Sequence, residues 1–323
     1  MPLHQTSGRW RLGLALSLVT VLLWGVEPIA LSVTVQALDV YTITWFRFLG
    51  CFGLLAVFLG VRRQLPTPEK LRSTPLGLLA LAIVFLAINY VLFLKGLAQT
   101  SPSNTEVLIQ LAPVFMGLGA LVVFKERYSL RQWLGLGVMS LGFTLFFHDK
   151  FKNLVAASTE YLIGSGLIIL SAAAWAVYAL AQKQLLQKLP STNIMLIIYG
   201  VCAIIFTPFA TPQKILTLDS LHLGLLIFCT FDVLIAYGAF AEALEHWEAS
   251  KVSAVLPLSP IVTLIAMSVL SLVGAKWIQP ERITALGVLG AGVVVVGAIS
   301  IALGATQAKT PGTKELEGES AVK

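Results

Sequence analysis

The chain has 323 residues, of which 57% are hydrophobic and only 12% are charged, and its mean hydropathy is +0.86. Charged residues make up about a quarter of an average soluble chain, and no soluble core of this size buries so much apolar surface. The composition excludes a secreted protein, a nucleic-acid binder and an ordinary cytosolic enzyme. The net charge of +6 fits basic residues in the loops between membrane spans.

Ten apolar stretches are long enough to cross a membrane, since a spanning helix needs roughly 20 apolar residues. They are uninterrupted, which favours helices over the alternating strands of a barrel. The first stretch contains Glu27-Pro28, whereas the apolar region of a signal peptide carries no charge. We therefore expect an uncleaved first helix. The predicted spans are 12–34, 41–61, 76–97, 102–124, 130–147, 159–182, 192–211, 221–243, 251–273 and 283–304.

The basic residues predict how these spans are oriented. With the N-terminus in the cytoplasm, fifteen of the 22 Lys and Arg residues fall in cytoplasmic segments and five in outer loops. This bias predicts a multi-pass protein of the plasma (inner) membrane with both termini cytoplasmic.

The two halves of the chain match at a nearly constant offset of 147 to 151 positions. Paired Trp, Tyr and Pro are rarer by chance than paired Leu or Ala, and the pairs include Trp24 with Trp175, Tyr90 with Tyr237, and Pro113 with Pro260. Each half holds five spans, and because five is odd the second half enters the membrane from the opposite side. We therefore predict an all-α integral membrane protein of ten transmembrane helices in two inverted five-helix repeats. The repeats are residues 1–150 and 151–304, and a disordered cytoplasmic tail follows at 305–323.

Several motifs resemble the EamA-type drug/metabolite transporter family. They are Trp24-Gly25, Arg47, the run at 96–101, Pro113 and the loop at 124–127. The resemblance covers all but the tail and implies a ten-helix carrier of a family that often exports amino acids or other small metabolites. It also implies a cavity lined mostly by the first, third and fourth helices and their counterparts. The chain departs from the family at Lys276, which stands where an acidic residue is usual and is the counterpart of Glu126.

Ionisable groups within the spans need an explanation, because the bilayer interior penalises them. Asp232 lies near the middle of its span, with no basic residue of another span at the same depth, and we interpret it as a proton carrier or cation-binding group. The alternative is a neutral carboxylic acid bonded to a neighbouring helix. Asn89 lies on the equivalent face of the third helix. Glu27 and Arg47 lie at similar depth and are predicted to form an ion pair, which can also open and close as a gate.

Aromatic residues at matching positions complete the predicted site. Such rings stack on a substrate or its cation, although ordinary helix packing is the alternative. Tyr178 takes the place of Glu27 in the second half. The predicted substrate and proton pathway is Asp232, Glu27, Asn89, Trp24, Tyr90, Trp175, Tyr178 and Tyr237.

Two mid-helix prolines, Pro113 and Pro260, are predicted hinges, with plain kinks as the alternative.

Lys95 and Glu106 are expected near the outer surface, where they can pair. Small residues, such as Gly287 in the last span, allow close helix contact within a monomer or across a homodimer.

We expect a secondary active transporter that exports a small metabolite, such as an amino acid, by proton-coupled alternating access. Its expected partners are the lipid bilayer, a small-molecule substrate and protons, with no nucleic acid, cofactor or metal. The chain has no Walker, HExxH or GxSxG motif, which favours a protein that is not an enzyme. A sensor or scaffold that kept the transporter fold, encouraged slightly by Lys276, and a membrane-embedded enzyme are the alternatives.

Overall fold

The computed structural model describes residues 9–67, 74–112, 114–115, 118–119, 129–148, 158–185, 188–247, 252, 255–278 and 284–304, in which every regular element is a helix. The first half contributes α1 (Trp10–Ala37), α2 (Val40–Val61), α4 (Leu76–Gln99), α5 (Pro102–Ile109) and α7 (Leu130–Phe146). The second half contributes α9 (Thr159–Leu185), α10 (Ser191–Phe206), η1 (Thr207–Phe209), η2 (Pro212–Thr217), α11 (Ser220–His246), η3 (Leu256–Leu258), α13 (Ser259–Leu272) and α14 (Ala285–Gly304). The predicted all-α fold is confirmed.

Several helices begin where the sequence offers a capping side chain. The first free N–H groups of a helix need an acceptor, and an Asp or Ser side chain just before the helix provides it. The helices α2, α5, α7 and α11 start in this way after Asp39, Ser101, Ser129 and Asp219.

Two helices are interrupted at equivalent places. Helix α5 ends at Ile109, and η3 begins at Leu256, which is 147 positions later. A proline follows each break at the fourth position, and a proline has no N–H to give to the carbonyl four residues earlier. Pro260 is the second residue of α13, whereas Pro113 lies outside the described residues. The hinge role of both prolines stays a prediction.

Most of the described helices suit a bilayer. Six of them, α1, α2, α4, α9, α10 and α11, contain stretches long and apolar enough to cross a membrane, and two shorter apolar helices occur at Leu256–Leu272 and Ala285–Ile301. Large apolar side chains remain exposed on their outer surfaces, among them Val57, Leu141 and Ile204. Such a surface is stable against lipid tails and unstable in water.

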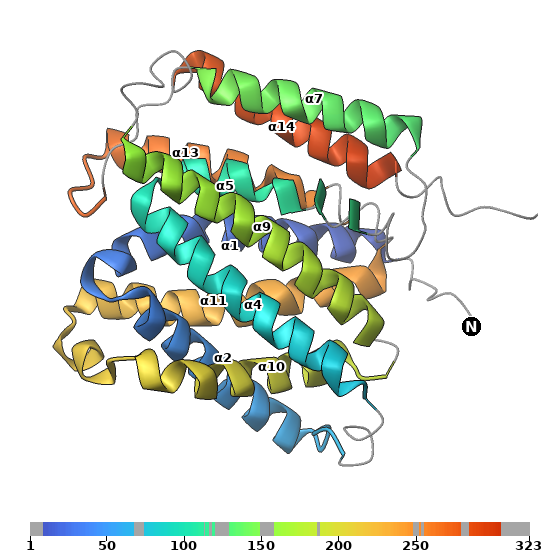
Figure 1. Cartoon of the computed structure of the whole chain (residues 1–323), viewed down its shortest axis with the longest axis vertical. Helices are drawn as coiled ribbons and strands as arrows, with labels where there is room; N and C mark the ends of the chain where they lie inside the picture. Colours follow the sequence, from blue (N-terminus) through green and yellow to red (C-terminus); the bar gives the residue numbers. More distant parts are fainter. Residues whose placement is uncertain are drawn as a thin grey trace, which may run out of the picture.

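Helices of the first half pack against helices of the second half throughout the bundle. The principal pairs are α1 with α11, α2 with α10, α4 with α9, and α7 with α14. Figure 1 shows the α7–α14 pair at one edge of the bundle and the α2–α10 pair toward the opposite edge. It also shows that α1 and α9 begin at opposite ends of the bundle, as inverted repeats require, and that the start of α1 and the end of α14 lie at the same end.

Hydroxyl contacts between helices occur in matched pairs. The Thr20 hydroxyl of α1 donates to the Ala236 carbonyl of α11 at 3.3 Å. The Ser171 hydroxyl of α9 donates to the Asn89 carbonyl of α4 at 3.1 Å. Ser171 follows Thr20 by 151 positions, and Ala236 follows Asn89 by 147 positions, so the two contacts are equivalent under the repeat register.

The buried cysteines form a second matched pair. The Cys51 thiol of α2 lies 3.5 Å from the Thr230 carbonyl, and the Cys202 thiol of α10 lies 3.9 Å from the Ile83 carbonyl. These residues are again related by the same two offsets. An approximate two-fold axis that exchanges the halves accounts for both pairs, since each contact repeats once with the halves interchanged.

Small residues bring α7 and α14 into close contact. A Cβ atom added to Gly142 would lie 2.5 Å from the Val294 backbone nitrogen, which leaves no room for a side chain. Ala291 is fully buried, and Gly287 is buried. The small-residue face of α14 therefore packs largely within the chain.

Candidate functional site

Three ionisable side chains interact inside the bundle, and we call Glu27, Arg47 and Asp232 the charged cluster. Arg47 and Asp232 are buried, whereas Glu27 is partly buried, at 17% exposure. Arg47 of α2 is 3% exposed and forms an ion pair with Glu27 of α1 through Nη2 and Oε1. Its guanidinium also lies over the Tyr90 ring, 5.1 Å from the ring centroid. The predicted Glu27–Arg47 contact is present, and its opening as a gate stays a prediction.

Asp232 is the third member of the charged cluster. It is 1% exposed, and neither carboxyl oxygen has a hydrogen-bond partner among the described residues. Glu27 and Arg47 are the charged groups that act on it, and Arg47 Nε also lacks a partner in the described part of the chain. Buried polar groups in proteins are nearly always satisfied. The open oxygens of Asp232 therefore suit a proton, a water molecule, a small cation or a donor group of a substrate, and the open N–H of Arg47 suits a water molecule or an acceptor group of a substrate.

Tyr237 joins the two symmetry-related tryptophans beside this cluster. Its ring packs edge-on against Trp24 of α1, with centroids 5.5 Å apart. The Trp175 side chain of α9 lies near the Tyr237 hydroxyl. Although Tyr237 lies five positions after Asp232, Asp232 is one of its electrostatic neighbours. Aromatic side chains from three helices therefore lie close to the charged cluster.

Two other predicted pathway residues make contacts between helices. The Asn89 amide donates to the Ser171 carbonyl at 3.0 Å and to the Ser171 hydroxyl at 2.8 Å. Tyr178 is 1% exposed, and its hydroxyl lies 3.1 Å from Met195 Sδ of α10. These contacts tie α4 to α9 and α9 to α10, and a part in the substrate pathway stays a prediction for both residues.

The expected pairing of Lys95 with Glu106 is wrong. Lys95 Nζ instead donates to the Tyr41 hydroxyl at 3.0 Å. Glu106 is only 5% exposed and accepts a hydrogen bond from the Ser259 hydroxyl of α13. Similar depth along two helices does not fix the direction in which each side chain points. Sequence reasoning therefore missed Glu106 as a buried acid between the halves. The signal was present as an acidic residue within an apolar span.

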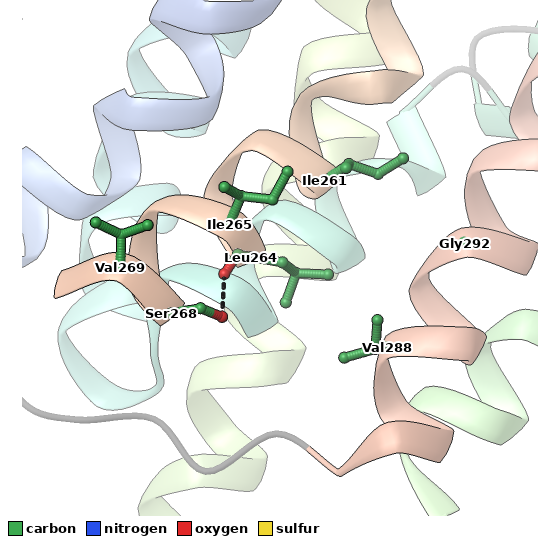
Figure 2. A pocket seen from close by; sticks show the side chains of 7 residues that line it. All are labelled: Ile261, Leu264, Ile265, Ser268, Val269, Val288 and Gly292. Atoms are coloured by element: carbon green, nitrogen blue, oxygen red, sulfur yellow. Dashed lines mark hydrogen bonds between the residues drawn. The ribbon is translucent and has the colours of Figure 1, made fainter. Parts of the chain in front are cut away.

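A groove of about 360 Å³ between α13 and α14 has a different character, as Figure 2 shows. Its only hydroxyl, on Ser268, donates to the Leu264 carbonyl at 2.7 Å. None of the charged cluster lines this groove, and its one hydroxyl already donates within α13, so the groove suits an apolar occupant better than a polar one. Its lining is Ile261, Leu264, Ile265, Ser268, Val269, Val288 and Gly292.

Comparison with known proteins identifies the family. The EamA-like transporter family matches residues 11–147 and again residues 162–303, and so covers both halves. The chain belongs to the EamA-like transporter family. The family and its named relatives are transporters rather than enzymes. For this EamA protein a lipid bilayer and a small-molecule substrate follow as partners.

Individual relatives cover nearly the whole EamA chain. The inner membrane transporter YhbE of Escherichia coli K12 is 34% identical over 295 residues, which are 91% of this chain and 92% of YhbE. A transporter of Haemophilus influenzae is 34% identical over 293 residues, covering 91% of this chain and 95% of that protein. A Salmonella typhimurium protein named "Probable amino-acid metabolite efflux pump" is 23% identical over 299 residues, with 87% and 92% covered.

A solved structure shares the fold. A chain titled "Crystal structure of protein" superposes with a TM-score of 0.60 at 18% sequence identity, covering 94% of this chain and 100% of that chain. At this identity the match supports the architecture alone.

Proposed function

We propose that this EamA-family protein is a secondary active transporter that exports a small metabolite, such as an amino acid, by proton-coupled alternating access. The observation that carries the proposal is Asp232, a fully buried carboxyl group with both oxygens unpartnered in the described structure, beside the Glu27–Arg47 ion pair. A buried ionisable residue in a membrane protein marks a substrate or ion pathway more often than it marks a stabilising contact.

The charge balance of the cluster supports proton coupling. One guanidinium balances one carboxylate, and Arg47 is already paired with Glu27. An ionised Asp232 without a partner would carry a large desolvation penalty, so it is favoured when a proton or a cation neutralises it. Binding and release of that proton on opposite sides of the membrane would couple the proton gradient to the movement of substrate.

The arrangement of the helices supports alternating access. Glu27 and Arg47 come from the first half and Asp232 comes from the second half, so the cluster bridges the two repeats. Inverted-repeat carriers move one repeat against the other around a site at their interface. The aromatic rings of Trp24, Trp175 and Tyr237 supply apolar surface there for the body of a substrate.

The position in the cell belongs to the same proposal. The excess of Lys and Arg in one set of loops supports an inner-membrane orientation with both chain ends in the cytoplasm. The ends of the described chain, at α1 and α14, lie on one side of the bundle, which fits this orientation (Figure 1).

Uptake into everted membrane vesicles tests the proposal. With an imposed pH gradient and a panel of amino acids, nucleobases and cationic drugs, we expect gradient-dependent uptake of at least one compound. Asp232→Asn should lower that uptake by about tenfold or more, because the variant cannot exchange a proton at this position. Asp219→Asn makes the same chemical change at the exposed start of α11 and should leave uptake unchanged.

Two outcomes would reject the proposal. Either no compound is carried in a gradient-dependent manner, or Asp232→Asn carries it as the unaltered protein does. Tight binding of a panel compound without any flux would instead favour the sensor or scaffold.

A further inference from the structure

A second buried acid, Glu106, lies apart from the charged cluster. It belongs to α5 in the first half and accepts a hydrogen bond from the hydroxyl of Ser259, the first residue of α13 in the second half. Glu106 is 5% exposed and Ser259 is 3% exposed. Within the described residues no basic side chain forms an ion pair with Glu106.

Among the described side chains, the helices packed against α5 bring no cation into an ion pair with this carboxyl group, and Arg11 of α1 lies exposed at the start of its helix. These helices are α1, α4, α9 and α13. Glu27 of α1 is the charged neighbour that acts on Glu106, and it is itself an acid. Lys95 of α4 donates to a tyrosine hydroxyl, and Tyr161 of α9 donates to Asn104. Helix α13 contains no ionisable residue. Glu106 is therefore most stable here when it carries a proton.

Hydrogen bonds continue from Ser259 toward the charged cluster. The Thr263 hydroxyl lies 3.2 Å from the Ser259 carbonyl and 2.6 Å from the Gly25 carbonyl of α1. Helices α1 and α13 approach closely here, since a Cβ atom on Gly25 would lie 2.9 Å from the Ser259 carbonyl oxygen. Gly25 precedes Glu27 by two residues, so a short chain of contacts connects Glu106 with the backbone that carries Glu27.

We propose that Glu106 is a second proton-binding site of the transport cycle and that its protonation controls the contact between α5 and α13. When ionised, the Glu106 carboxylate accepts from Ser259 and holds the two halves together. When a proton from the aqueous phase adds to the carboxylate, the neutral acid is a weaker acceptor, and the Ser259 hydroxyl can donate within its own helix instead. The proton returns to water when the halves open on the other side.

This second site rests on the transport function proposed above and adds to it. Glu106 and Glu27 repel each other when both are ionised. A proton on Glu106 removes that repulsion and so favours the ionised Glu27 that Arg47 requires. The two sites are therefore coupled, with proton binding at Glu106 strengthening the Glu27–Arg47 pair.

Infrared difference spectra recorded against pH test the site without any substrate. The full chain in lipid vesicles should show carboxylic-acid bands from buried protonated groups. Glu106→Gln should remove one band. Ser259→Ala should keep that band and let it persist to higher pH, because the carboxylate loses its hydrogen-bond donor. Glu160→Gln makes the identical change at an exposed position at the start of α9 and should leave the buried bands unchanged.

A shorter acid separates titration from packing. Glu106→Asp keeps a carboxyl group but withdraws it from Ser259, so its band should remain, and the pH at which that band disappears should no longer respond to Ser259→Ala. A Glu106→Gln spectrum with every band of the unaltered protein would overturn the proposal.

Flux measurements then distinguish this site from the transport function itself. In vesicles with an imposed pH gradient and the panel of amino acids, Glu106→Gln should lower gradient-driven flux about tenfold, because glutamine can neither bind nor release a proton. Exchange of substrate without a gradient should persist. If the unaltered chain carries no compound, the proposed transport function is rejected, whereas the infrared spectra still test whether Glu106 binds a proton. If gradient-driven flux is unchanged in Glu106→Gln, Glu106 is not a coupling site.

Discussion

Arg47 interacts with two carboxylates, one in direct contact and one at a greater distance. Glu27 is its ion-pair partner, whereas Asp232 acts on it from farther away. Removing one member of a buried pair leaves an uncompensated charge, and the loss is larger than the net contribution of the intact pair. Removing Arg47 leaves two carboxylates without a cation, whereas removing Glu27 leaves Arg47 with a second carboxylate nearby. Loss of Arg47 should therefore cost more stability than loss of Glu27.

This inequality predicts different stabilities for two variants. Arg47→Gln leaves both Glu27 and Asp232 without a cation and should lower the free energy of unfolding by about 3–5 kcal/mol. Glu27→Gln leaves Asp232 as a carboxylate for Arg47 and should have a clearly smaller effect. Thermal unfolding of the purified protein in detergent measures both. Equal losses in the two variants would contradict the idea that Asp232 can replace Glu27.

At the scale of elements, the contact between α7 and α14 depends on glycine. Four glycines, Gly135, Gly142, Gly290 and Gly297, meet the backbone of the facing helix so closely that a Cβ atom would overlap it. Backbone atoms cannot move aside as a flexible side chain can. Close backbone approach gains van der Waals contact in the bilayer, where the hydrophobic effect does not drive helix association.

Two alanine substitutions on the same helix test this interpretation. Gly142→Ala should destabilise the protein by about 1–3 kcal/mol, because the new methyl group overpacks the interface. Gly137→Ala has open space around the added Cβ atom and should be neutral or slightly stabilising, since alanine favours a helix by about 1 kcal/mol over glycine. Thermal unfolding of both variants checks the difference. A Gly142→Ala protein as stable as Gly137→Ala would show that α14 can move away at no cost.

At the scale of the whole molecule, the scaffold is symmetric and the chemistry is not. Glu27, Arg47 and Asp232 have Tyr178, Ile198 and Phe85 as their counterparts under the repeat register. Those counterparts belong to one apolar cluster of the core. The same backbone architecture thus carries charges on one side of the two-fold axis and packed apolar side chains on the other.

The two halves also meet at the end of the bundle where α2 begins. The Thr211 backbone N–H donates to the Thr42 hydroxyl at 2.8 Å, and the Thr211 hydroxyl donates to Asp39 at 3.2 Å. Partial burial acts to raise the pKa of Asp39, but hydrogen bonds from Thr42 and Thr211 and the nearby Lys214 hold it below its ordinary value. The stabilising effect of this carboxylate is therefore complete above its unfolded pKa of about 3.9 and is lost only as the pH falls through the lower folded value. At neutral pH the contact is not a proton switch.

A disulfide across this contact tests alternating access. The Thr42 and Thr211 hydroxyl oxygens lie 3.4 Å apart, so cysteines at both positions can be oxidised with little backbone movement. Thr42→Cys with Thr211→Cys should lose transport on oxidation and regain it on reduction, because this end can no longer open. Each single variant under the same oxidant is the control, and the native cysteines are all buried. Full transport by the cross-linked protein would argue against opening at this end.

The sequence by itself determined the number and order of the helices, the five-helix duplication and the inversion that an odd number of spans requires. These features follow from the length of each apolar stretch and from the offset between the two halves, and both can be read directly along the sequence. It also predicted the Glu27–Arg47 contact, because adjacent helices place the two residues at the same depth. Only the tertiary structure decided that Glu106 meets Ser259 rather than Lys95, that Asn89 is bonded to Ser171, and that Asp232 has no partner in the described structure. Which side chains meet depends on the rotation of each helix about its axis and on packing between distant segments. The depth of a residue along its span determines neither of these.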